Sequence, residues 1–86
     1  DRATIIMDYF NELLADREIS VRAKQKDDCL HLIVEAERLP ERQKLVKFIR
    51  KNLLQLHLPA MGVVKLHGRK SDQKKLEWSE EIHFDS

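Results

Sequence analysis

Four short segments of the chain alternate apolar and polar residues with a period of two, and this pattern restricts the fold more than any other feature. Between Ile19 and Lys24, apolar residues at positions 19, 21 and 23 alternate with Ser20, Arg22 and Lys24. A period of two places successive side chains on opposite faces of a strand, so each segment predicts a strand with one buried and one solvated face. The other three alternating segments cover residues 29–35, 63–69 and 77–84.

Each pair of predicted strands follows a segment with helical periodicity. The first helix is expected from about Arg2 to Ala15, where apolar residues recur along one helix face at Ile6, Phe10, Leu13 and Leu14. The second is expected within residues 38–59, with Pro40 in its first turn and Pro59 preventing its continuation.

The order helix–strand–strand–helix–strand–strand predicts an α+β fold with two layers. We expect an αββαββ sandwich in which a four-stranded antiparallel sheet carries both helices on one face. A ferredoxin-like chain whose first strand is moved to the end has the same order, so the fold is expected to be ferredoxin-like or a circular permutation of it. With 86 residues, the chain forms a single domain over residues 1–86. Because it starts without Met, we expect either a domain excised from a longer protein or a trimmed chain.

The predicted hairpins fix which residues face each other. In the first hairpin, a two-residue turn at Lys26-Asp27 pairs Ile19 with Val34 and Val21 with Leu32. In the second, the predicted pairs are Val64 with Ile82, Leu66 with Glu80, Lys65 with Glu81, His67 with Ser79 and Arg69 with Glu77. Two cross-strand ion pairs on a solvated face then explain why charged residues alternate in the last two strands.

Composition limits the classes of function. The formal net charge is +1 although 36% of the residues are charged, whereas a dedicated nucleic-acid binder usually has a clear basic excess. Cys29 is the only cysteine, so no intramolecular disulfide and no cysteine-based metal cluster is possible. This fits a cytoplasmic protein. No apolar run approaches the ~20 residues of a membrane span, and no signal peptide is visible.

The second half of the chain resembles a small domain family of cyanobacterial proteins. In that family, a helix ending in apolar residues is followed by V-x-V-x-GR, a polar loop and W-S-x-x-F, and the matching residues here are Val64, Leu66, Gly68, Arg69, Trp78, Ser79 and Phe84. The family has no established activity, so the resemblance implies an accessory or interaction module and transfers no catalytic residue. This chain departs from the family at Leu66-His67, and its loop RKSDQKK lacks the usual glycine.

The leading functional prediction is a non-enzymatic protein-interaction or dimerisation module. Exposed sheet edges, a small core and scattered apolar residues on the open face favour binding to a protein partner or to a second copy, through edge pairing or exchange of an αββ half. The residues expected to bind a partner are Ile33, Val63, Lys65, His67, Arg69 and Trp78.

Nucleic-acid binding is the alternative. It would use the basic part of the open face and the loop of residues 69–75. The residues are Arg22, Lys24, Lys65, Arg69, Lys70, Lys74 and Lys75. The open face offers no aromatic side chain on which a base could stack, and Glu77 and Glu81 would repel phosphate, so this partner is less favoured.

Neither a metal site nor a catalytic site is predicted. His31, His67 and His83 are expected on the open face, where strand order decides whether they converge, and no HxH or HExxH spacing is present. Cys29 and His31 are neighbours on one strand face, but nothing Gly-rich surrounds the cysteine to form an oxyanion site. We therefore expect no enzyme and no cofactor.

Overall fold

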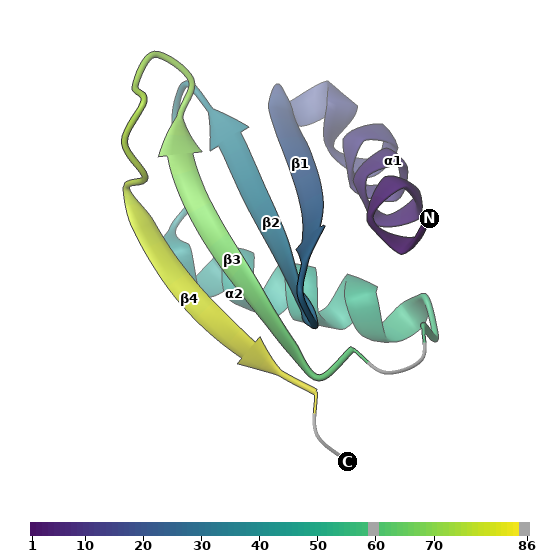
Figure 1. Cartoon of the computed structure of the whole chain (residues 1–86). Helices are drawn as coiled ribbons and strands as arrows, with labels where there is room; N and C mark the ends of the chain where they lie inside the picture. The colour runs from purple at the N-terminus through teal and green to yellow at the C-terminus, as the bar shows by residue number, and fades with distance from the viewer. Residues whose placement is uncertain (59–60, 85–86) are drawn as a thin grey trace.

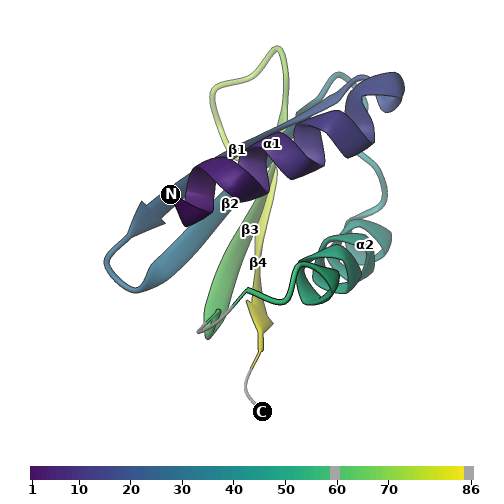
Figure 2. The same ribbon diagram turned by 90° about the vertical axis from the view of Figure 1, so that its right-hand side faces the viewer.

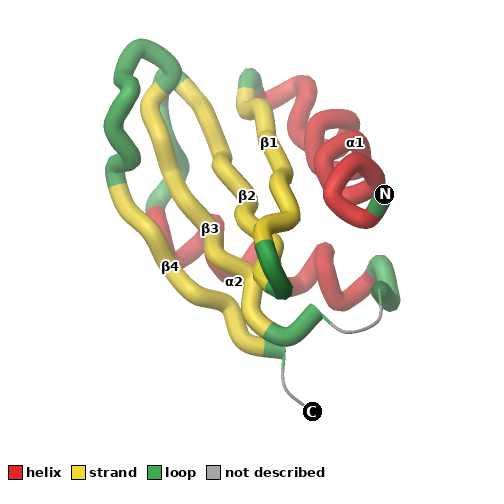
Figure 3. The backbone as a smooth tube through the Cα atoms, in the orientation of Figure 1, coloured by secondary structure: helices red, strands yellow, loops and turns green. Residues whose placement is uncertain are grey.

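The structure is a computed structural model that describes residues 1–58 and 61–84 (Figures 1 and 3). Its elements are helix α1 (Arg2–Leu14), the 3-10 turn η1 (Ala15–Arg17), strands β1 (Ile19–Lys26) and β2 (Cys29–Ala36), helix α2 (Arg42–Gln55), and strands β3 (Val63–Lys70) and β4 (Trp78–His83). The predicted α+β class and the order of the elements are confirmed.

The second helix is shorter than its pattern predicted. It starts at Arg42 because the Glu41 carboxylate accepts hydrogen bonds from the amides of Gln43 and Lys44, which leaves Pro40 before the cap rather than in the first turn. At the other end, His57 has a left-handed φ of 52°, which turns the chain away from the helix axis. The expected role of Pro59 lies outside the described residues.

The sheet is mixed, so the prediction of a fully antiparallel sheet is wrong. The strand order is β1-β2-β3-β4, and β3 runs parallel to β2, with Leu30 beside Val64. The reason is that α2 carries the chain back across the sheet between the two strands, as in a βαβ crossover. The predicted ferredoxin-like arrangement of the strands is not confirmed. In a split βαβ unit another strand separates the two parallel strands, whereas β2 and β3 are direct neighbours.

The two hairpin predictions had different outcomes. In the first hairpin the predicted register is wrong. The turn lies at Asp27-Asp28, one residue later than predicted, so each residue of β1 pairs two positions further along β2, and Val21 pairs with Val34 instead of Leu32. Asp27 has a φ of 56°, a conformation that aspartate tolerates in such turns. A shift of two leaves the buried face unchanged. In the second hairpin, four of the five predicted pairs are confirmed, and the fifth, Arg69 with Glu77, does not form.

The core forms between the helices and one face of the sheet, as the alternation predicted. Both helices contribute to the same buried cluster, with Phe10 from α1 and Ile49 from α2 among its residues. The inward side chains of the strands complete it: Val21, Leu30, Leu32, Val34, Val64, Leu66 and Ile82. Figures 1 and 2 show that α2 crosses behind the sheet while α1 runs along β1. The opposite face of the sheet is left open. No helix within the described residues is long and apolar enough to cross a membrane.

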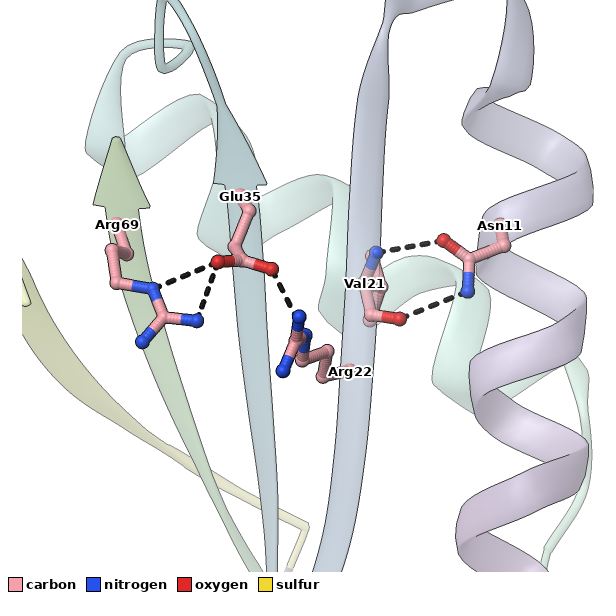
Figure 4. Close-up of polar contacts among 5 residues, drawn as sticks. All are labelled: Asn11, Val21, Arg22, Glu35 and Arg69. Carbon is pink, nitrogen blue, oxygen red and sulfur yellow. Dashed lines mark hydrogen bonds and ion pairs between the residues drawn. The ribbon is translucent and has the colours of Figure 1, made fainter. Parts of the chain in front are cut away.

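The two outer edges of the sheet differ in what lies beside them. On the β1 edge, the Asn11 side chain of α1 donates to the carbonyl of Val21 at 2.9 Å and accepts from its amide at 2.7 Å (Figure 4). One side chain thus replaces the missing neighbouring strand at this point. At the other edge, β4 has no helix alongside it (Figure 1).

Candidate interaction site

The open face consists of rows of side chains that cross the strands, as the registers of neighbouring strands define. The first row contains Lys24, His31, Lys65 and Glu81, and the second contains Arg22, Ile33, His67 and Ser79. The third contains Ser20, Glu35 and Arg69. Five of the six predicted partner-binding residues lie on this face, and Trp78 lies on the other.

Glu35 is the centre of an ion-pair cluster on this face. Its carboxylate accepts hydrogen bonds from the Nε (2.8 Å) and Nη2 atoms of Arg69 and lies 3.1 Å from Nε of Arg22 (Figure 4). The Arg69 and Glu35 side chains are only 21% and 15% exposed, whereas that of Arg22 is 70% exposed. The cluster therefore fixes Arg69 firmly and Arg22 loosely.

The predicted pairing of Arg69 with Glu77 is wrong. Strand β4 begins only at Trp78, and the Glu77 amide donates to the carbonyl of Gly68 at 2.6 Å. The parallel neighbour β2 places Glu35 beside Arg69 instead. An antiparallel sheet would not have brought these two residues together, so sequence reasoning could not find the pair without the strand order.

Two of the three open-face histidines meet. His31 Nδ1 lies 3.2 Å from His67 Nε2, and the ring planes differ by only 5° with centroids 5.4 Å apart. The short distance between the nitrogens shows that the rings meet edge to edge. On its other side, His67 Nδ1 lies 2.6 Å from the Ser79 hydroxyl. A polar chain of three side chains thus crosses β2, β3 and β4.

The pKa of His67 is lowered from its ordinary value, first by burial and then by the positive charge of neighbouring His31 and Lys65. A neutral His67 has one donor nitrogen and one acceptor nitrogen, which suits a chain with a partner on each side. Protonation would place donors on both nitrogens and require His31 to accept.

The remaining charged residues are arranged less tightly. Lys65 and Glu81 are opposite each other, as predicted. Among residues 1–58 and 61–84, however, no ion pair within 4 Å joins them, and Glu81 lies 3.2 Å from Nε2 of His83 instead. His83 is therefore separate from the other two histidines. Within the same residues, no group of three His, Cys, Asp or Glu side chains is positioned to hold a metal ion.

The two apolar residues predicted for the open face do not form one patch. Ile33 lies in the second row, between Arg22 and His67, while Val63 lies opposite His83 at the start of β3. The row that contains His31 and Lys65 separates them. Both side chains are only half-buried.

Trp78 lies on the helix side of β4, as its position predicted. Its indole covers Gly68 so closely that a Cβ atom on the glycine would lie 2.5 Å from Cε2 of the ring. The Arg42 guanidinium carbon lies 5.9 Å from the ring centroid, and Arg42 Nε donates to Glu80 at 2.8 Å. The sequence did not predict the contact of Arg42 with Trp78, since its pattern placed Arg42 only within a helix.

Strand β4 forms the outer edge of the sheet that no helix covers (Figure 1). The Phe84 amide donates to the Gly62 carbonyl at 2.8 Å. In an antiparallel pair, the main-chain groups of alternate residues bond to the neighbouring strand, so those of Ser79, Glu81 and His83 point away from β3. Arg50 Nη1 donates to the His83 carbonyl at 2.9 Å. Over the part of the chain that the structure describes, the outward groups of Ser79 and Glu81 have no hydrogen-bond partner.

The basic residues of the nucleic-acid alternative are dispersed. Arg22 and Arg69 are paired with Glu35. Lys70 ends β3, and Lys74 and Lys75 are exposed in the loop that leads to β4. Lys24 and Lys65 lie in the first row, with His31 between them.

No protein-family model matches the chain, and no curated protein and no solved structure matches it. The resemblance to the cyanobacterial domain family stays a prediction.

Proposed function

We propose that the protein is a non-enzymatic interaction module in which β4 binds an extended segment of a partner protein as a fifth strand. The observation that carries this proposal is the difference between the two sheet edges. Helix α1 lies along β1, where its Asn11 binds the main chain of Val21, whereas no helix lies outside β4 (Figure 1) and the amide and carbonyl groups of Ser79 and Glu81 face outward there. Strand addition obtains its affinity from such main-chain groups and its specificity from alternate side chains.

The surroundings of β4 define the chemistry of the partner segment. On the helix side, every second residue of an added strand would lie beside Trp78 and Phe84, each of which has an arginine over its ring. On the open side, the intervening residues would meet a hollow of about 360 Å³ lined by Lys65, His67, Ser79, Glu80 and Glu81. The partner segment should therefore alternate apolar or aromatic residues with polar ones.

This function needs no catalytic group and no cofactor, and it accords with the resemblance to an accessory domain family. A cytoplasmic location is part of the proposal, because a lone thiol such as Cys29 suits a reducing compartment. The nucleic-acid alternative is less well supported, since Glu35 neutralises two of its arginines. Self-association through β4, or exchange of an αββ half, is an alternative outcome of the test below.

The test is a selection from a displayed library of random peptides of about ten residues, the length of a long strand. Selected peptides are measured by fluorescence polarisation against Glu81→Pro, which removes one outward amide at an edge position where proline is tolerated. The matched control is Glu81→Thr, which also removes the charge but keeps the amide.

We expect Glu81→Pro to weaken binding by about tenfold or more, the effect of losing one or two hydrogen bonds. Glu81→Thr should bind within about twofold of the parent, since rim charges contribute little. Failure to select any peptide, or equal binding by both variants, would contradict strand addition. Concentration-dependent dimerisation that Glu81→Pro abolishes would identify a second copy of β4 as the occupant.

A further inference from the structure

A second surface lies on the helices, away from β4 and the open face. Helix α2 contains five basic residues and no acidic residue between Arg42 and Gln55. Arg42 and Arg50 bend toward β4, where they bind Glu80 and the carbonyl of His83. The other three, Lys44, Lys47 and Lys51, are exposed at spacings of three and four, so they form a single stripe on the face opposite the core.

Helix α1 and the turn after it have the opposite charge pattern. Asp8, Glu12 and Asp16 recur every four residues and are exposed, so they form an acidic stripe. Among residues 1–58 and 61–84, no side chain of either stripe belongs to an ion pair within 4 Å. Like charges at these spacings repel one another within each helix, and a surface of opposite charge would relieve both stripes.

Large exposed apolar side chains accompany both stripes. Ile5 and Leu13 on α1 are 55% and 42% exposed, and Leu54, three residues after Lys51 on α2, is 53% exposed. Leu13 borders a shallow hollow of about 560 Å³ that also includes Tyr9, Glu12 and Asp16. Charge and apolar surface therefore coincide on each helix, which is typical of a binding surface rather than of a purely solvated face.

The two stripes belong to helices that touch each other. The Tyr9 hydroxyl donates to Oδ1 of Asn52 at 2.8 Å, and the rings of Phe10 and Phe48 are 6.4 Å apart, so α1 and α2 are neighbours (Figure 2). A two-fold axis between them would bring α1 of one copy against α2 of the other, and the same rotation would form the equivalent contact a second time.

We propose that α1 and α2 form a symmetric homodimer interface in which the acidic stripe of each copy contacts the basic stripe of its partner. A second copy satisfies both stripes and covers the exposed leucines and isoleucine at once. A nucleic acid would satisfy only the basic stripe and would be repelled by the adjacent acidic one. The interface leaves β4 free, so each dimer would present two strand-binding edges.

The test combines charge reversals with sedimentation equilibrium at protein concentrations up to about 1 mM, the range of weak association. One variant carries Lys47→Glu with Lys51→Glu, and another carries Glu12→Lys with Asp16→Lys. Each should weaken the dimer by at least about tenfold, because each change acts in both copies of the contact. Lys74→Glu with Lys75→Glu is the matched control for the α2 variant, since it lowers the net charge by the same amount in an exposed loop.

The decisive measurement is an equimolar mixture of the two helix variants. One variant has two acidic helices and the other has two basic helices, so both contacts are complementary in the mixed pair, and a heterodimer should form at about parental affinity. Restored association also shows that both variants are folded. High salt should weaken parental and mixed dimers alike, because screening acts on exposed pairs.

Three results would overturn the proposal. The first is a parental chain that stays monomeric to about 1 mM, and the second is a mixture that does not associate. The third is a monomeric chain that binds a single-stranded oligonucleotide and loses this binding with the two α2 reversals, which would reassign the basic stripe to nucleic acid. A dimer that only Glu81→Pro disrupts would refute this interface while supporting strand pairing at β4, so the two proposals fail separately.

Discussion

The contact between Asn11 and Val21 should contribute measurably to the free energy of unfolding of this small domain. Replacing Asn11 with alanine removes both hydrogen bonds that its side chain makes with the Val21 main chain. Val21 is almost fully buried, so water would not readily replace them. Two bonds at about 1 kcal/mol each give about 2 kcal/mol, from which about 0.6 kcal/mol is recovered because alanine favours helix.

The expected loss is therefore about 1.5 kcal/mol in the free energy of unfolding. Measured by urea denaturation and circular dichroism, it should lower the midpoint by about 1.5 M, if the slope is about 1 kcal/mol per molar urea for a chain of this size. The melting temperature should fall by roughly 6–12 °C.

Two further variants make the measurement specific. Asn11→Asp keeps an acceptor for the Val21 amide but directs a carboxylate at the Val21 carbonyl, so it should be at least as destabilising as alanine. Thr4→Ala, at an exposed position of the same helix, should change stability by no more than about 0.5 kcal/mol. If Asn11→Ala leaves the midpoint within about 0.3 M of the parent with an unchanged slope, α1 does not secure the β1 edge and the edge argument is refuted.

Three other predictions concern the sheet. Gly68→Ala should cost about 1–3 kcal/mol in thermal or urea unfolding because its Cβ would collide with the Trp78 ring, and little in a background of Trp78→Ala, where the ring is gone. Because the pKa of His67 is lowered on folding, the unfolded chain binds more protons. Stability should therefore fall as the pH drops below about 6.5, and His67→Gln should flatten this slope in unfolding curves taken across that range; an equally steep slope would exclude His67. Glu35→Gln should cost about 1–2 kcal/mol by leaving partly buried Arg69 without its carboxylate, whereas Arg22→Ala should cost under about 0.5 kcal/mol; equal losses would contradict the unequal roles of the two arginines.

The sequence predicted the faces of the strands much better than their neighbours. The side chains of Leu30, Leu32 and Val64 are buried and that of Lys65 is exposed, because alternation depends only on the local geometry of a strand. The same alternation fits a parallel and an antiparallel partner equally well. Strand order and direction depend on how the βαβ connection crosses the sheet, and no residue in α2 signals that path.

The site residues divide in the same way. His67 beside Ser79 follows from a hairpin, a local element, and was predicted. His67 beside His31 and Arg69 beside Glu35 depend on the contact between β2 and β3, whose paired residues are 34 positions apart along the chain. The register of the second hairpin from Val64 to Ile82 was therefore predictable from its residues, apart from the pair of Arg69 with Glu77, whereas the ion-pair cluster and the histidine pair became visible only with the strand order.

The contacts among the polar groups of the open face also explain why we assign partner binding to the β4 edge and to the helices rather than to this face. Glu35 holds two arginines, and His67 has partners on both sides, so a ligand on these rows would have to break interactions that already exist. Such replacement gains little, because each lost hydrogen bond offsets a new one. The main chain of β4 at Ser79 and Glu81 is in the opposite situation, since its outward groups have no partner within the described residues and a new strand would add bonds without removing any. The same reasoning favours the helix stripes, whose acidic and basic side chains have no ion-pair partner among residues 1–58 and 61–84, so that association would pair them without breaking existing contacts.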